Sequence, residues 1–304
     1  MPSVLHLGDI AGVPQELSKA QRRLGWKSDV MSFQPHPFDY GVDIYRPTKL
    51  PFPLRYAERM CSLSQVVEDY DVLHFHWSSL VPFGFDLPLW KGLGKRIIMH
   101  HHGDDIRNKG EGWLCSRFAD QILVSTPDLL AWSSRAVWLP NPIDLNEYRF
   151  IGAKEHAGTI RIVHAPSLRS TKGTDHVLKA LDDLQKEGYD VKLILVENMS
   201  HQEALEQYKK ADIVVDQLLV GWYGVFAIEC MALGKPVLAY IRKDLCSFLD
   251  DMPLINTSPS SLKEDLKMLI EDASIREDTG SRARKFVEHT HSSDKIAKCV
   301  INLY

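Results

Sequence analysis

The chain has 304 residues, a net charge of −4 and a charged fraction of 25%, which together predict about two globular domains at ~100–200 residues each and argue against a nucleic-acid partner. The five cysteines are odd in number and show no CxxC spacing, so we expect neither a disulfide framework nor a cysteine-rich zinc site. No secretory signal pattern and no run of about 18 apolar residues is visible, which predicts a cytoplasmic protein.

The first half of the chain alternates short apolar strands with polar loops and helices. A helix is expected at 14–25, because Leu17, Ala20 and Leu24 fall on one face and Gly25 follows as a stop. Prolines near residues 140–142 indicate a linker. The strands of this half are expected at 3–8, 28–33, 70–77, 95–103, 119–126 and the start of 135–148.

The pattern begins again after residue 150. Strands are expected at 158–167, 189–198, 212–218 and 237–241, with helices at 174–188, 202–211, 225–233 and 292–304. Continuous apolar strands separated by helices are typical of parallel sheets that are covered on both faces. We therefore predict an α/β protein of two doubly wound, Rossmann-like domains, 1–150 and 151–290, that face each other across a cleft, with a helix at 291–304 packing back on the first domain.

One acidic residue, Glu229, stands inside the almost wholly apolar segment 221–240. A buried carboxylate without a partner is costly, so a ligand is a natural explanation. Two adjacent hydroxyls, such as those of a ribose, suit its two oxygens. Gly221 and Gly224 permit a tight loop before the helix, whose first N–H groups favour a phosphate.

A second polar stretch, "HAPSLRSTKGTD" at 164–175, also lies between a strand and a helix. Lys172 stands where a cation would reach phosphates at the carboxyl end of the strand. The alternative is an ordinary capped loop with a solvated lysine.

Together, 164–175 and "GWYGVFAIECMALGKPV" at 221–237 resemble the GT-B nucleotide-sugar glycosyltransferases, specifically the retaining group of family 4, also called group 1. The family pattern reads approximately E-G-F-G-x-x-x-x-E-A-M-A-x-G-x-P-V. The resemblance implies that Glu229 binds the donor ribose, and that Gly224 with the backbone of Val225 and Phe226 lies beside the donor phosphates. Lys172 falls on the family's lysine, and we expect it to stabilise the leaving diphosphate.

Two positions depart from that pattern. The first Glu of the family pair is replaced by Gly221, and an Arg that often precedes the Lys is replaced by Ser167. We hypothesise that Arg169 supplies the second cation from a shifted position. Asp216 and Gln217, at the end of a strand, are expected to face the cleft and to take over part of the role of the missing Glu.

The N-terminal half extends the resemblance. "DIAGVPQELSKAQRRLGWKSDV" is similar to the family's first glycine loop, where Gly12 would let the backbone approach the donor phosphate or the acceptor. "MHHHGDDIR" at 99–107 is similar to its H-G-x-D loop. The resemblance implies that His102 lies near the transferred sugar and that Asp105 is the loop acid, and we take both, with Lys172, as the catalytic set.

Two further features concern metals and the acceptor. Three consecutive histidines, His100 to His102, permit a metal site with His74 or His76, but family members commonly work without a metal, so we predict none. Aromatic residues from Trp77 to Trp90 are either core residues or an acceptor surface. We assign Trp77 and His76 to the acceptor. Lys91, Lys95 and Arg96 nearby suit a lipid-linked acceptor at a membrane.

The resulting expectation is a hexosyl- or N-acetylhexosaminyl-type transferase. It would use a UDP- or GDP-sugar as co-substrate, bind no further cofactor and transfer the sugar with retention, as in polysaccharide biosynthesis. The acceptor would be a glycan, a lipid-linked sugar or a small molecule, reached in the cytoplasm or at the inner face of a membrane. A sugar-nucleotide epimerase and a non-catalytic sugar-nucleotide-binding protein are the alternatives.

Overall fold

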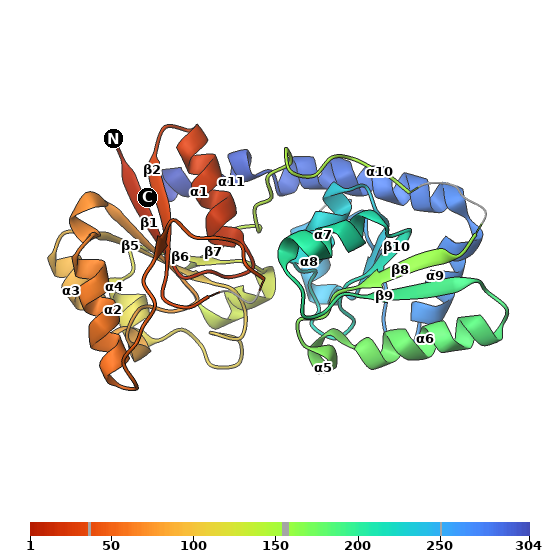
Figure 1. The fold of residues 1–304 in the computed structure, drawn as a ribbon, viewed down its shortest axis with the longest axis horizontal. Coiled ribbons are helices and arrows are strands. Elements are labelled where there is room, and N and C mark those ends of the chain that lie inside the picture. Colours follow the sequence, from red (N-terminus) through yellow and green to blue (C-terminus); the bar gives the residue numbers. More distant parts are fainter. Residues whose placement is uncertain (36–37, 154–157, 250) are drawn as a thin grey trace. The chain divides into compact units, whose positions relative to one another are not determined.

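The computed structural model describes residues 1–35, 38–153, 158–249 and 251–304. They form two compact units, one of residues 1–144 with 293–304 and the other of residues 145–292. Each contains one parallel sheet with helices packed against it (Figure 1), so the predicted pair of doubly wound α/β domains is confirmed. Within the described residues, no helix is both long enough and apolar enough to cross a membrane.

The first unit contains a seven-stranded sheet of order β3-β2-β1-β4-β5-β6-β7, in which all neighbours are parallel. Its interior is continuous and apolar, as expected for a sheet that helices cover. Its strands are β1 (Ser3–Leu7), β2 (Lys27–Ser32), β3 (Ile44–Tyr45), β4 (Val72–His76), β5 (Arg96–His101), β6 (Gln121–Val124) and β7 (Ala136–Trp138), and its helices are α1 (Val13–Arg23), α2 (Leu54–Ser64), α3 (Leu87–Gly92), α4 (Trp113–Phe118) and α11 (Ser293–Leu303).

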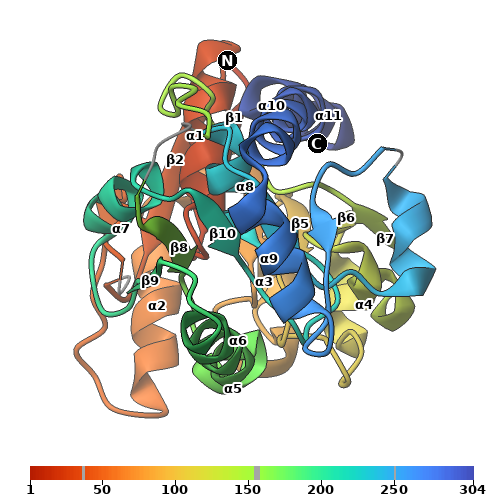
Figure 2. The ribbon, with the colours of Figure 1, turned by 90° about the vertical axis from the view of Figure 1, so that its right-hand side faces the viewer.

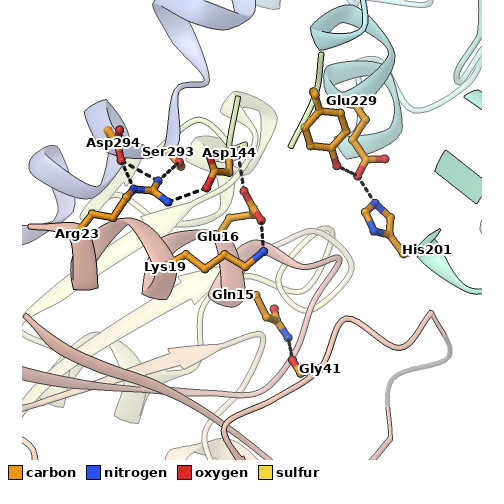
Figure 3. Close-up of polar contacts among 11 residues, drawn as sticks. Gln15, Glu16, Lys19, Arg23, Gly41, Asp144, His201, Glu229, Ser293 and Asp294 are labelled. Atoms are coloured by element: carbon orange, nitrogen blue, oxygen red, sulfur yellow. Dashed lines mark hydrogen bonds and ion pairs between the residues drawn. The ribbon is translucent and has the colours of Figure 1, made fainter. Parts of the chain in front are cut away.

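The last helix, α11, packs beside α1 (Figure 1), although 270 residues separate them in the sequence. Arg23 joins them, because its guanidinium donates to Asp294 at 2.7 Å and to Ser293 Oγ at 3.1 Å. The same side chain donates to Asp144 at 2.6 Å (Figure 3). Arg23 therefore ties the chain segment that leaves the first unit to the helix that returns to it.

The second unit contains a five-stranded parallel sheet of order β12-β11-β10-β8-β9. Helices α6 and α9 pack together on one side of it (Figure 2), where their apolar faces share a core with the strands. Its strands are β8 (Ile160–His164), β9 (Val191–Leu195), β10 (Ile213–Val215), β11 (Val237–Ala239) and β12 (Ile255–Asn256), and its helices are α5 (Arg169–Lys172), α6 (Thr174–Lys186), α7 (His201–Lys209), α8 (Val225–Ala232), α9 (Leu262–Glu271) and α10 (Ala273–Thr290).

Candidate functional site

The loop between β10 and α8 is organised by the side chain of Gln217. Its Oε1 accepts hydrogen bonds from the amides of Val220 at 2.6 Å and Gly221 at 3.2 Å, while its Nε2 donates to the carbonyl oxygens of Trp222 and Tyr240. Gln217 is fully buried. This environment differs from the expected one, because an amide whose oxygen and nitrogen both serve the loop holds that loop in shape and does not face a ligand.

Gly221 stands where the resembling family has an acid, and the structure gives a physical reason. Its φ is +94°, a left-handed conformation that side chains rarely adopt. A Cβ at this position would lie 3.1 Å from the side chain of Arg242, whose own amide donates to the Gly221 carbonyl at 3.0 Å. This loop therefore cannot present a side chain at residue 221 without strain.

Asp216, at the end of β10, joins two groups that the sequence assigns to the donor phosphates. Its Oδ1 lies 2.9 Å from the Lys172 ammonium, and its Oδ2 accepts from the Gly224 amide at 2.7 Å. The Asp216 side chain is fully buried, and that of Lys172 is 16% exposed. A lysine ammonium has three donors, so Lys172 keeps donors for a ligand while Asp216 fixes its position.

Helix α8 begins directly after Gly224, and no side chain among the described residues caps it. The amides of Val225, Phe226 and Ala227 precede the first intrahelical bond, which runs from Ile228 N to Gly224 O. Phe226 packs its ring 4.8 Å from that of Tyr208 and so anchors the helix start. The result is a cluster of free N–H groups close to Lys172, an arrangement that suits an anion.

Glu229 lies one turn further along α8 and is only 5% exposed. Its Oε1 accepts a hydrogen bond from the Tyr148 hydroxyl at 2.8 Å and lies 2.5 Å from His201 Nε2 (Figure 3). Neither bond uses Oε2. The carboxylate predicted as a ribose ligand is therefore held by two side chains that the sequence analysis did not single out.

The loop between β8 and α6 contains the remaining donor-side residues. Ser167 and Arg169 are exposed, and the Arg169 guanidinium pairs with Glu197 through bonds of 2.8 and 2.6 Å. His164 lies beneath this loop, where its Nε2 contacts Thr174 Oγ1 at 2.9 Å and its Nδ1 contacts the Val215 carbonyl at 2.8 Å. Burial lowers the pKa of His164, so a neutral imidazole joins β8, β10 and the start of α6.

In the first unit, Asp105 organises the loop after β5. Its Oδ2 lies 2.7 Å from His101 Nδ1, and its Oδ1 accepts from the Gly103 amide at 2.8 Å. Burial alone would raise the pKa of Asp105, but the His101 and Gly103 hydrogen bonds hold that pKa below its ordinary value.

Gly12 has φ +74°, and a Cβ there would lie 2.8 Å from the Tyr40 ring. Gly12 thus makes room for Tyr40.

Five histidines from neighbouring strands lie against one another in the first unit, four of them buried and His102 partly buried. The register places His6 on β1 beside His74 on β4, and His76 on β4 beside His100 on β5, with His102 directly after β5. His74 and His76 stack with centroids 4.4 Å apart, and His100 and His102 with centroids 4.3 Å apart. We call this set, His6, His74, His76, His100 and His102, the histidine array.

The hydrogen bonds of the array fix the tautomer of each ring that takes part. Gln21 Oε1, which can only accept, lies 2.8 Å from His6 Nε2, so that nitrogen carries the proton. His6 Nδ1 then accepts from His76 Nε2, and His76 Nδ1 accepts from His102 Nε2, each at 3.0 Å. His102 Nδ1 accepts from Ser125 Oγ at 2.7 Å.

This assignment requires neutral imidazoles. Burial keeps them neutral because it lowers their pKa values. Burial lowers the pKa of His6 and that of His102 to about 4. It also lowers the pKa values of His74, His76 and His100 well below the ordinary one. Both ring nitrogens of His102 are occupied within the chain of hydrogen bonds, so neither is free for a sugar hydroxyl.

The structure also groups the residues considered for a metal. Ring nitrogens of His76, His100 and His102 lie within 4.8 Å of one another, as do those of His6, His74 and His76. Hydrogen bonds join His6 to His76 and His76 to His102, whereas His74 contacts Tyr304 and His100 contacts Ser125. His74 Nε2 and His100 Nδ1 have no hydrogen-bond partner among the described residues. The absence of a metal stays a prediction.

Some of the residues considered for the acceptor line a cavity, and others are packed in the protein interior. His76 and Trp77 line a cavity of about 380 Å³, and Trp77 is 38% exposed. Trp90 is fully buried and donates to Asp86. The three basic residues nearby are each engaged, since Lys91 pairs with Asp120, Lys95 donates to the Tyr70 carbonyl and Arg96 donates to the Leu303 carbonyl.

Comparisons with known proteins support the same fold. No protein-family model matches the chain. A stretch of 101 residues is 30% identical to an uncharacterized glycosyltransferase of Methanocaldococcus jannaschii. That stretch is 32% of this chain and 26% of the relative, so the match spans about a quarter of that protein's length.

Three solved structures illustrate the likeness. A sucrose-phosphate synthase from Thermosynechococcus elongatus has a TM-score of 0.70 at 15% identity, over 100% of this chain and 98% of that one. An alpha-glucosyltransferase in complex with UDP and DNA has a TM-score of 0.70 at 12% identity, over 100% and 99%. Starch synthase IV from Arabidopsis thaliana, bound to ADP and acarbose, has a TM-score of 0.68 at 12% identity, over 100% and 98%. The chain has the GT-B fold of two Rossmann-like domains, which confirms the predicted fold class.

Proposed function

We propose that this protein is a retaining glycosyltransferase that moves a hexosyl or N-acetylhexosaminyl group from a UDP- or GDP-sugar to an acceptor. The observation that carries this proposal is the cluster of Lys172, Asp216 and the uncapped start of α8, one helical turn from Glu229. A partly buried cation next to free N–H groups suits a diphosphate, and a fixed carboxylate suits a ribose. The fold and the partial match to a glycosyltransferase support the same reading.

The chemistry follows from where charge develops. When the bond between the anomeric carbon and the donor phosphate breaks, negative charge builds on the nucleoside diphosphate. Lys172 and the α8 amides stabilise that charge. The acceptor oxygen bonds to the anomeric carbon from the leaving-group side, and its proton passes to a donor phosphate oxygen. This route requires no protein nucleophile and tolerates Gly221.

The roles of the other residues follow their environments. Glu229 fixes the register of the donor through its ribose. Asp216 positions Lys172, while Gln217 shapes the loop. His102 and Asp105 lie in the first unit, and we assign them to positioning the 101–105 loop. All five cysteines are free, in keeping with a reducing, cytoplasmic location.

Donor binding tests the proposal. We expect UDP-glucose, UDP-N-acetylglucosamine or GDP-mannose to raise the melting temperature of the wild-type chain, because a ligand of the folded state stabilises it. Lys172→Ala and Glu229→Gln should each weaken binding at least tenfold. Lys179→Ala, an exposed lysine of α6, is the matched control.

The products separate the candidate functions. Release of a nucleoside diphosphate with sugar transferred to an acceptor or to water supports the transferase. An isomerised donor would instead identify an epimerase, and binding without turnover over a broad acceptor panel would identify a binding protein. Normal donor affinity in both variants would refute the assignment of the donor site.

A further inference from the structure

The cavity that His76 and Trp77 line lies at the carboxyl ends of β1, β2 and β4. Its lining includes Gly8, Phe33 and Arg59. A second cavity of about 260 Å³ shares Arg59 and Trp77 with it. The larger volume falls within the ~300–1,000 Å³ typical of small-ligand sites. This position is where a doubly wound sheet binds ligands.

Arg59 is partly buried, and its charge has no anionic partner among the described residues. Among the described residues it forms no hydrogen bond or ion pair, and its Nε is shielded from solvent without a partner. The guanidinium lies instead over the rings of Phe33, at 5.6 Å, and Tyr56, at 5.9 Å. By contrast, Arg23 and Arg107 each pair with two aspartates.

A second guanidinium, that of Arg55, lies one helical turn earlier on α2. Its Nε is likewise buried and unpartnered, and its guanidinium lies over the Tyr56 ring at 5.3 Å. Glu58 forms no ion pair with either guanidinium among the described residues, and its Oε2 accepts from the backbone amides of Lys49 and Leu50 at 2.8 and 2.9 Å. Two cations therefore face each other's field without an acid between them.

The two unpaired guanidinium charges favour the binding of an anion at this site. Partial burial, followed by the charge of Arg55, lowers the pKa of Arg59. Desolvating a cation is costly unless an anion compensates it. The lining also includes the Asp9 carboxylate, but Asp9 makes no ion pair with Arg59. A planar guanidinium with rigid donors is well suited to grip a phosphate or carboxylate in a bidentate manner.

The neighbouring aromatic residue supplies a second, independent sign of a built site. Trp77 has φ +75°, a left-handed conformation that is rare for a bulky residue and costs of order 1–3 kcal/mol. Its amide donates to the His100 carbonyl at 2.9 Å, which holds the strained turn in place. The strain places a partly exposed indole against both cavities, where its face suits a sugar ring.

We propose that this cavity binds the acceptor and that Arg59, supported by Arg55, recognises an oxyanionic group on it, a phosphate or a carboxylate. The identification of the ligand as the acceptor rests on the proposed function. The binding of an oxyanion does not, and it is tested separately.

The experiment measures binding to the full chain at low salt by isothermal titration calorimetry. The probes are glucose, glucose 6-phosphate, glucuronate and inorganic phosphate. We expect at least one of the anionic sugars to bind tenfold or more tightly than glucose, and Arg59→Gln to remove that advantage. Arg55→Gln should reduce it, and Arg59→Lys should retain part of it because the charge remains.

Arg117→Gln is the matched control. The Arg117 guanidinium also lies 5.6 Å from an aromatic ring, that of Phe118, but it is exposed and outside both cavities. Its substitution should leave anion binding unchanged. Equal affinity for glucose and its charged analogues, no anion binding at millimolar concentrations, or full binding in a folded Arg59→Gln variant would each overturn the proposal.

Two further arms identify the source of the oxyanion and separate the two proposals. Sedimentation with phosphatidylglycerol vesicles but not phosphatidylcholine vesicles, lost in Arg59→Gln, would assign the group to a lipid. Retained glucose 6-phosphate or glucuronate binding without sedimentation would assign it to a soluble acceptor. Release of a nucleoside diphosphate from the donor by the wild-type chain, measured without an acceptor and over the same broad acceptor panel, tests the transferase activity alone. Its absence together with Arg59-dependent anion binding would refute the proposed function and leave the oxyanion site standing.

Discussion

The histidine array predicts an unusually steep loss of stability in mild acid. Each of its five imidazoles is neutral in the folded unit, because burial holds the pKa of His6 and that of His102 to about 4 and the other three well below the ordinary value. In the unfolded chain an imidazole has a pKa of about 6.5. The unfolded state therefore binds more protons below pH 6.5, and stability falls as the pH falls from 6.5 toward 4.

The magnitude follows from proton linkage. At pH 5.5 about nine tenths of unfolded imidazoles are protonated, so each ring contributes a slope of about 1.2 kcal/mol per pH unit. Five rings give about 6 kcal/mol per pH unit, and a similar total loss between pH 7 and pH 5.5. A typical domain has only about 5–15 kcal/mol of stability, so the first unit should approach unfolding near pH 5.5.

Urea titrations between pH 7.5 and 5.5, followed by tryptophan fluorescence, measure this slope. The chain has seven tryptophans, of which Trp222 alone lies in the second unit, so the signal reports mainly on the first. His100→Gln should reduce the slope by about one proton's worth, about 1.2 kcal/mol per pH unit. His176→Gln, an exposed histidine, should leave it unchanged. A free energy of unfolding that is flat between pH 6.5 and 5.5 would refute the neutral array.

Two glycine substitutions test the backbone of the second unit. Gly221→Ala should cost about 1–2 kcal/mol for the left-handed φ, a melting-temperature loss of about 2–4 °C per kcal/mol, plus the displacement of Arg242. Gly188→Ala is the control, because Gly188 has the same φ of +94° with open space around it. Equal losses of melting temperature in the two variants would show that the Arg242 side chain moves aside at no cost. Gly280→Ala would place a Cβ 2.1 Å from the Gly234 carbonyl oxygen, and we expect a cost of at least ~1–3 kcal/mol in urea unfolding. An unchanged urea midpoint would contradict the close packing of α10 on that loop.

The fold was predictable because it depends on local patterns. Alternating strands and helices predict two parallel sheets, and an acid inside an apolar helix predicts an unusual role for Glu229. The partners of Glu229 were not predictable in the same way. Tyr148 lies 81 residues away and His201 lies 28 residues away, and each reaches the carboxylate only through the tertiary fold.

The histidine array was predictable only in part. His74 with His76, and His100 with His102, alternate along their strands, so each pair shares a face of the sheet. What the sequence does not state is that β1 and β5 are the two neighbours of β4, which brings His6 and His100 to the same place. A doubly wound strand order applied to these three strands would have predicted the array. The array was not predicted because the strand order was not considered, although the histidines themselves are visible in the sequence.

The conformation of Gly221 and the position of Asp216 depend on the same loop. The left-handed turn at Gly221 allows Gln217 to bind the loop amides from within, and the same turn brings Gly224 N within 2.7 Å of Asp216. A side chain at residue 221 would disturb that turn and, with it, the contact that aligns Asp216 with Lys172. Asp216, at the end of β10, is fully buried and lies 2.9 Å from the Lys172 ammonium. From there it positions the cation.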